Sequence, residues 1–151
     1  MYRDSQSDSK TRKKIGHSRT ILVGDLNMNP FENGVVNSGG LHGVMNRSIA
    51  ARNTRIVNSK TYTFFYNPMW NFFGDMKSPP GTYYYYKSEP KVYFWNIFDQ
   101  VLIRPELLSR FDTNDLQILT SDGEISFLND QGLPDTRIVS DHLPIIFKIS
   151  L

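Results

Sequence analysis

The chain has 151 residues, and its 17 Lys and Arg against 15 Asp and Glu give a net charge of +2, which neither requires nor excludes a nucleic-acid partner. The absence of cysteine excludes disulfides, thiolate nucleophiles and Cys-ligated zinc, and with only three histidines an oxygen-ligated Mg²⁺ or Mn²⁺ is favoured over a histidine-rich zinc site. No apolar run is long enough for a membrane span and the first twenty residues lack the apolar core of a signal peptide, so we expect a cytoplasmic chain without a membrane span.

The first part of the chain is predicted to alternate short elements with turns. Residues 1–18 are polar and basic, and we interpret them as a flexible segment or a helix remnant that precedes a single domain over residues 19–151. The elements expected next are a buried strand over 20–23, a turn at Asn29-Pro30, a short helix over 31–36, a weak helix over 45–57 and a structured aromatic loop over 61–77.

The second part is predicted to consist mainly of strands. After a turn at Pro79-Pro80-Gly81, the expected elements are strands over 82–87 and 96–103, a short helix over 105–111, and strands over 116–120 and 143–149. Because the hydrophobic period is mostly two and the helices are short, we predict an α+β fold with a largely buried sheet.

Polar residues follow the first predicted strand directly. Asp25 and Asn27 are two residues apart, so on an extended backbone their side chains share one face. The carboxylate is then placed to take a proton from water and the amide to hold a phosphate oxygen. The alternative is a plain turn, because Asp and Asn after a strand commonly bond to the local backbone.

Two further polar groups are attached to apolar runs later in the chain. Asp99 lies inside an apolar strand, where a charge is costly unless it is paired, and the partner that we predict is His142. Such a pair would fix the tautomer of the imidazole. Asp141 precedes the histidine and is a candidate metal ligand, although Ser140-Asp141-His142 is equally compatible with an ordinary sheet edge.

The aromatic segments allow two interpretations. Residues 83–86 and 62–73 are rich in Tyr, Phe and Trp, which can stack on nucleic-acid bases. Alternating core and rim positions of a sheet explain the same composition, and we favour that explanation.

Three segments, in this order, resemble the endonuclease/exonuclease/phosphatase superfamily, the DNase I-like group. The family motif GDxN matches Gly24-Asp25-Leu26-Asn27, its strand aspartate matches Phe98-Asp99-Gln100-Val101-Leu102, and its terminal SDHxP matches residues 140–144. The resemblance covers residues 19–151. It implies that the chain forms the C-terminal half of a DNase I-like two-sheet β-sandwich flanked by helices.

The resemblance also implies roles for these residues. Asp25 would be the acid–base residue, Asn27 would orient it and bind phosphate oxygen, Asp99 would orient His142, and His142 would contact the scissile phosphate. Asp141 would contribute to a site for Mg²⁺ or Mn²⁺. The implied reaction is metal-dependent hydrolysis of a phosphate ester, with nucleic acid as one substrate class and a small-molecule phosphate ester as the alternative.

One part of the family pattern is missing. Family members carry an Asn and a metal-ligating Glu on strands that precede GDxN, and residues 1–23 offer neither. We therefore expect a site completed by self-association or by a complementing N-terminal half, because half a sandwich leaves an apolar face exposed. The alternative is a non-catalytic remnant that acts as an interaction module.

Overall fold

The computed structural model describes residues 17–150 and combines short helices with several small sheets, which confirms the α+β class. The segment predicted as polar and flexible, residues 1–18, lies almost wholly outside the described residues. Within the described part of the chain, no helix is long and apolar enough to cross a membrane.

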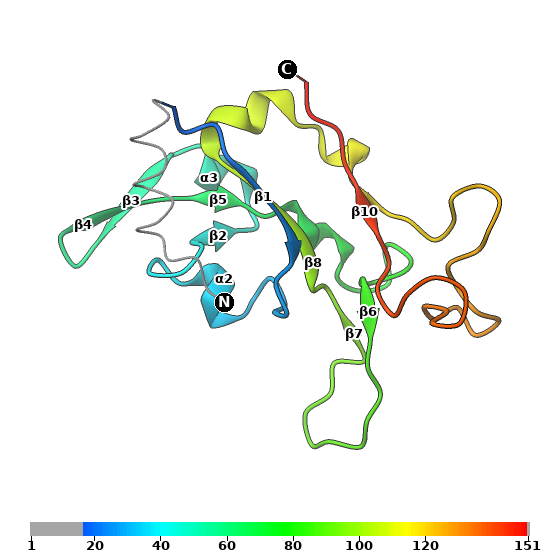
Figure 1. Cartoon of the computed structure of the whole chain (residues 1–151). Coiled ribbons are helices and arrows are strands. Elements are labelled where there is room, and N and C mark those ends of the chain that lie inside the picture. Colours follow the sequence, from blue (N-terminus) through cyan, green and yellow to red (C-terminus); the bar gives the residue numbers. More distant parts are fainter. Residues whose placement is uncertain (1–16, 151) are drawn as a thin grey trace.

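The largest sheet has four strands in the order β1-β8-β5-β2 (Figure 1). β1 (Ile21–Asp25) and β8 (Asp99–Ile103) are antiparallel, with Ile21 opposite Ile103 and Asp25 opposite Asp99. β5 (Phe65–Tyr66) pairs with the other edge of β8, and β2 (Gly43–Val44) runs parallel to β5. A strand is confirmed at the position predicted over 20–23, and it runs from Ile21 to Asp25. The prediction that it is buried is wrong: β1 lies at the edge of the sheet, none of its residues is buried, and Val23 is 52% exposed.

The central strand β8 is covered on both faces, which explains why four of its residues in a row are buried. Leu102 faces a small cluster with Val35 and Phe65, next to α2 (Asn33–Val36). Val101 and Ile103 face the main core, which also contains, among others, Tyr66, Met69, Phe72, Leu107, Leu108, Phe111, Leu116 and Leu143. Because the faces alternate along the strand, Asp99 lies on the same side as Val101.

The helix predicted over 45–57 is wrong beyond its first turn. α3 (Arg47–Ala50) is capped by Asn46, whose side chain accepts from the Ile49 N–H. β3 (Thr54–Val57) and β4 (Lys60–Thr63) then form a hairpin. Asn58 and Ser59 at its tip both have positive φ, at 48° and 63°, as a type I′ turn requires, and this turn chemistry overrides the helical pattern.

The segment predicted as a loop over 61–77 contains regular structure. It includes most of β4, all of β5 and the 3₁₀ helix η1 (Pro68–Phe72). Asn67 caps η1, since its side chain accepts from the Met69 N–H, and Pro68 suits the first turn because its nitrogen needs no partner.

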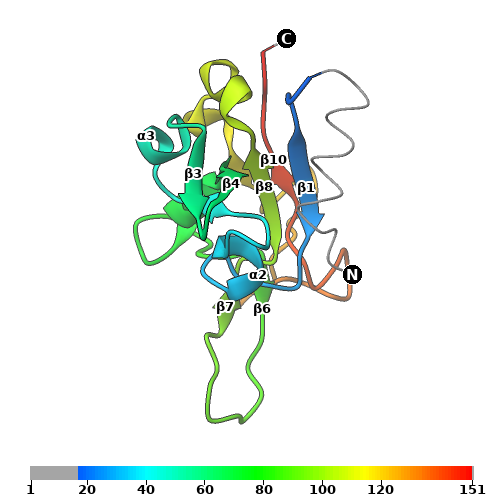
Figure 2. The same ribbon diagram turned by 90° about the vertical axis from the view of Figure 1, so that its left-hand side faces the viewer.

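The strand predicted over 82–87 is present but shorter, whereas the single strand predicted over 96–103 is interrupted and forms β7 (Trp95–Asn96) and β8 in two different sheets. β6 (Tyr83–Tyr84) and β7 are the paired part of a long hairpin that projects away from the main sheet in Figures 1 and 2. The helix predicted over 105–111 is the 3₁₀ helix η2 (Pro105–Arg110), and η3 (Thr113–Asp115) follows.

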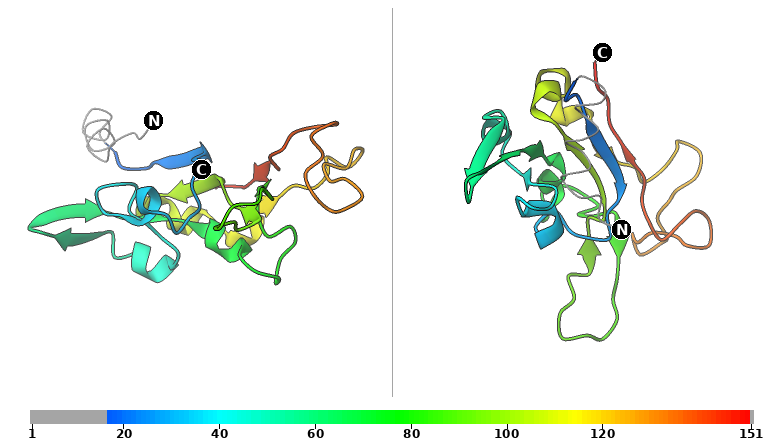
Figure 3. Two further views of the ribbon diagram at one scale, coloured as in Figure 1. Left: turned by 90° about the horizontal axis from the view of Figure 1, so that it is seen from below. Right: turned by 60° about the vertical axis from the view of Figure 1, so that its left-hand side comes forward.

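The C-terminal segment covers the main core. β9 (Gln117–Ile118) pairs with β10 (Ile145–Ile146), which occupies only part of the strand predicted over 143–149. Burial nevertheless alternates from Leu143 to Ile149, so the predicted period of two is confirmed over the whole segment. Seen from below, the β3–β4 hairpin and the long loop between β9 and β10 (residues 119–144) lie at opposite ends of the molecule (Figure 3).

Candidate active site

Two carboxylates face each other where β1 ends and β8 begins. The Leu26 N–H donates to the Phe98 carbonyl at 2.8 Å, so Leu26 and Phe98 form a hydrogen-bonded pair. Hydrogen-bonded and non-hydrogen-bonded pairs alternate between antiparallel strands, so the neighbouring pair, Asp25 and Asp99, exchanges no backbone hydrogen bonds. Side chains are closest in such pairs, with Cβ atoms about 4.5–5.5 Å apart. The sheet therefore holds two acidic groups side by side on one face.

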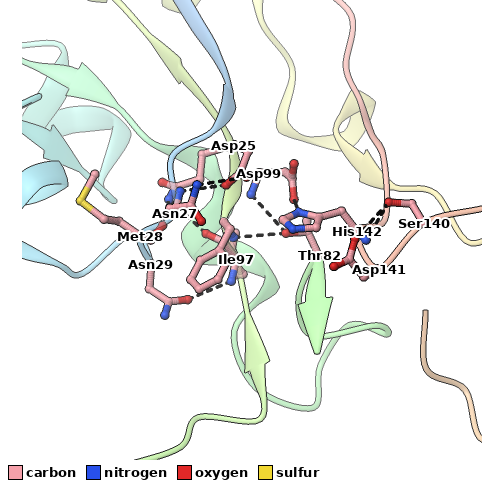
Figure 4. A network of polar contacts seen from close by, with 12 residues as sticks. Asp25, Asn27, Met28, Asn29, Thr82, Ile97, Asp99, Ser140, Asp141 and His142 are labelled. Atoms are coloured by element: carbon pink, nitrogen blue, oxygen red, sulfur yellow. Dashed lines mark hydrogen bonds and ion pairs between the residues drawn. The ribbon is translucent and has the colours of Figure 1, made fainter. Parts of the chain in front are cut away.

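Asp25 and Asn27 come together through a turn, not through the predicted extended backbone. Asn27 has a φ of 50°, and its backbone N–H donates to Asp25 Oδ1 at 2.8 Å while its Nδ2 donates to Oδ2 at 3.3 Å. This is the local turn that the sequence offered as the alternative. Figure 4 shows that it nevertheless places the amide against the carboxylate, so Asn27 can orient Asp25.

Asp99 and His142 form the predicted pair. His142 Nδ1 lies 2.7 Å from Asp99 Oδ2, although the two residues are 43 positions apart. A carboxylate only accepts, so Nδ1 donates to Asp99 and Nε2 is the ring nitrogen left to face a ligand. His142 Nε2 has no hydrogen-bond partner in the described part of the chain, and 26% of the side chain is exposed, so solvent or a ligand can reach it.

Aromatic rings hold the imidazole in place. The Tyr83 ring centroid is 4.8 Å from that of His142, and the Phe98 centroid is 6.5 Å away. Tyr83 and His142 are also joined by an isolated antiparallel β-bridge. Packing and backbone pairing together fix the direction in which the ring points.

Thr82, which the sequence analysis missed, links both halves of the pair. Its buried Oγ accepts from the backbone N–H groups of Phe98 and Asp99 at 3.2 Å each. Its carbonyl oxygen accepts from the Leu143 N–H at 2.7 Å, one residue beyond His142. One side chain and one peptide group thus position the backbone of Asp99 relative to that of His142.

Buried amides support the other side of the site and were also missed. Asn29 Nδ2 donates to Asn96 Oδ1 at 2.9 Å, and Asn29 Oδ1 accepts from the Ile97 N–H at 2.8 Å. Gln100 Nε2 donates to the Met28 carbonyl and Gln100 Oε1 accepts from Asn67. Asn96 and Gln100 gave the same signal as Asp99, a polar residue within an apolar run.

Asp141 is not brought together with the other candidates. It lines a hollow with Tyr84 and Tyr86, whereas His142 contacts Tyr83 on the other face of the same strand. Asp141 lies at a bend, whereas His142 is fixed by its β-bridge to Tyr83, so the two side chains have different surroundings. In Figure 4 the His142 ring is directed toward Asp99, while Asp141 lies beside Ser140.

The residues present do not make a complete cage for Mg²⁺. Across residues 17–150, no three His, Asp or Glu side chains are grouped so that they could hold a metal ion. Asp25 and Asp99 oppose each other, but Asp99 is engaged by His142 and Asp141 faces elsewhere. Mg²⁺ is usually held by one or two carboxylates plus water and substrate phosphates, and further ligands would have to come from outside this group.

Comparison with known proteins found no match to a family model, to a curated protein or to a solved structure.

Proposed function

We propose that the chain carries the acid–base part of a phosphoester hydrolase, with phosphodiester hydrolysis as the reaction. The observation that carries the proposal is the 2.7 Å contact between His142 Nδ1 and Asp99 Oδ2 at a sheet end that also presents Asp25. Asp25 lies opposite Asp99, Asn27 bonds to Asp25, and His142 bonds to Asp99, so all four groups belong to this end of the sheet. Hydrolysis of a phosphate ester needs such groups to move protons and to bind phosphate oxygen.

Each group has a defined task in this proposal. Asp25 takes a proton from water as the water oxygen bonds to phosphorus. The bond from phosphorus to the leaving oxygen breaks, the leaving oxygen takes its proton from solvent, and Asp25 later returns its own proton to solvent. In its doubly protonated form His142 donates its Nε2–H to a phosphate oxygen, while Asp99 accepts from the Nδ1–H. Asn27 Nδ2 orients Asp25, and in this proposal its second N–H donates to a phosphate oxygen.

The fold, the metal and the compartment form part of the same proposal. We infer that residues 19–151 correspond to one half of a DNase I-like sandwich and that Mg²⁺ or Mn²⁺ assists the reaction. Because the described residues lack a full ligand set, the remaining ligands come from the substrate phosphate and from a second copy or a complementing N-terminal half. A chain without cysteine suits the reducing cytoplasm, which is the compartment that we propose.

The test is divalent-dependent hydrolysis of bis-p-nitrophenyl phosphate by the full chain, alone and at concentrations that favour self-association. His142→Ala should abolish most of the activity with the fold intact, and Asp99→Asn should reduce it strongly by disturbing the tautomer of the ring. Tyr62→Ala, on β4 at the far end of the molecule, is the matched control and should keep full activity. Near wild-type turnover in either site variant would refute the proposed pair.

A non-catalytic interaction module is the second candidate. The observation in its favour is the lack of a three-ligand metal group among the described residues. A folded chain that shows no hydrolysis with Mg²⁺ or Mn²⁺ at any concentration would favour this candidate over the enzyme.

A further inference from the structure

A hollow of about 640 Å³ lies beside the candidate active site, on the far side of Asp141. Its volume falls within the range of about 300–1,000 Å³ that is typical of small-molecule sites. The lining residues come from the projecting hairpin and from the long loop between β9 and β10: Tyr84, Tyr86, Asn129, Gln131, Leu133, Pro134, Thr136 and Asp141.

Two tyrosine rings form the aromatic wall of this hollow. The rings of Tyr84 and Tyr86 are inclined by only 24°, with centroids 6.2 Å apart. Tyr86 is 74% exposed, so core packing does not explain its place on the hairpin. Nearly parallel, accessible rings are suited to stack against planar groups of a ligand.

The remaining walls offer neutral hydrogen-bonding groups and one carboxylate. Asn129 Oδ1 already accepts from the backbone N–H groups of Gln131 and Leu133, which leaves its Nδ2 to donate. Gln131 and Thr136 can both donate and accept, and Asp141 accepts only. Among the described residues that line the hollow there is no Lys, Arg or His. A phosphate group is therefore disfavoured here, while amino and ring N–H groups of nucleobases are well matched.

The opposite face of the same hairpin strand has the complementary chemistry. Tyr83 packs on His142, Tyr85 stacks on Tyr83, and Lys87 Nζ lies 5.8 Å from the Tyr85 ring centroid. A cation and the imidazole are thus on one face, and aromatic and amide groups are on the other. Asp141 lines the hollow and the next residue, His142, belongs to the proposed phosphate site, so the hollow and the phosphate site are neighbours.

We propose that this hollow binds a base of a single-stranded nucleic acid whose phosphate lies at His142. The inference rests on the proposed function for the position of the phosphate, and it names the substrate class. A polyphosphorylated small molecule fits less well, because its additional phosphates would meet Asp141 and no cation in the hollow. Duplex nucleic acid fits less well too, since paired and stacked bases are not free to enter.

The test is binding of a fluorescent single strand of about eight nucleotides to the full chain in EDTA, where cleavage is prevented. An abasic strand of the same length, with the same phosphates, is the comparison probe. We expect the base-containing strand to bind more tightly than the abasic one. Tyr86→Ala should weaken binding of the base-containing strand by about 5- to 150-fold, the range for loss of one base–aromatic stack.

Matched variants locate the effect. Gln131→Ala, at an exposed loop position, should weaken binding by about 2- to 12-fold, as expected for one lost hydrogen bond. Tyr62→Ala, a tyrosine lost at the far end of the molecule, should bind as the wild type does. Urea unfolding of each variant shows whether it has folded.

The outcomes separate this inference from the proposed function. Equal affinity for the abasic strand, or unchanged affinity in a folded Tyr86→Ala, overturns the base-binding hollow whether or not the chain hydrolyses bis-p-nitrophenyl phosphate, which has no base. Base-dependent binding by a chain without hydrolytic activity overturns the enzyme and keeps the hollow as a nucleic-acid site.

Discussion

Replacing Thr82 by Val should destabilise the chain more than its small change in volume suggests. The side chain is fully buried at 0% exposure, and its Oγ is the acceptor for the backbone N–H groups of Phe98 and Asp99. The N–H of Asp99 points away from β1, because Asp25 and Asp99 do not exchange backbone bonds. Valine fills the same space but accepts no hydrogen bond, so both N–H groups are left without this partner.

The expected size follows from the geometry of those bonds. A buried donor without a partner costs about 1–3 kcal/mol, and both distances of 3.2 Å are at the long end of the N–H···O range, which favours the lower figure for each. The free energy of unfolding should therefore fall by about 2–3 kcal/mol. This is a large share of the roughly 5–15 kcal/mol that stabilises an ordinary domain.

Urea unfolding followed by tryptophan fluorescence measures the loss, since Trp95 lies in the adjacent strand β7. Thr82→Ser is the matched control, because it keeps the oxygen and removes one methyl group at a cost of about 1 kcal/mol. A Val variant as stable as the Ser variant would show that the hydroxyl does not hold the start of β8. In that case Thr82 would not position Asp99 relative to His142.

Three further changes test the surroundings of the site. Asp25→Asn keeps the side-chain oxygen that accepts in the turn but removes one of two opposed carboxylates, which repel each other. In urea unfolding it should raise the free energy of unfolding by about 0.2–1 kcal/mol, while hydrolysis falls. A loss of stability would contradict repulsion between the two carboxylates. Asn29→Leu should lower the free energy of unfolding by about 2–4 kcal/mol, because the Ile97 N–H and the buried Asn96 side chain both lose the hydrogen bond to Asn29. Burial chiefly lowers the pKa of His42 below 6.5, so stability should be full above pH 6.5 and fall as the pH drops from there toward the lower folded-state pKa. His42→Gln should flatten that part of the urea-stability profile, and an unchanged slope would exclude His42 as its cause.

The pair of Asp99 and His142 was predictable from the sequence because burial makes an unpaired charge expensive. Asp99 lies within an apolar run, so it needed a partner, and His142 was the candidate cation that also needed orienting. The same reasoning applied to Asn96 and Gln100 would have found the buried amides. The sequence around Thr82 gave no comparable signal, because its role depends on the tertiary contact that brings the start of β8 against its side chain.

Other errors arose where local geometry decides and composition does not. The β3–β4 hairpin depends on two consecutive residues with positive φ, and Asn58-Ser59 carries only a weak signal for such a turn. The position of Asp141 was not predictable from strand alternation, because the chain bends at this residue just before the β-bridge of His142. The family resemblance predicted Asp141 as a metal ligand, whereas in the structure it lines the hollow beside Tyr84.

The opposed carboxylates help to decide between an enzyme and a scaffold. An asparagine at position 99 could still hydrogen-bond the ring of His142, although more weakly and without fixing the tautomer, so a purely structural bond does not require a charge there. A carboxylate directly opposite another carboxylate costs stability instead, by about 0.2–1 kcal/mol. A site that moves protons on a phosphate ester does require ionised groups, so the function explains why two carboxylates are kept despite their cost in stability. An interaction module has no comparable use for Asp25 opposite Asp99, and a stability gain in Asp25→Asn accompanied by loss of hydrolysis is the combination that only the enzyme explains.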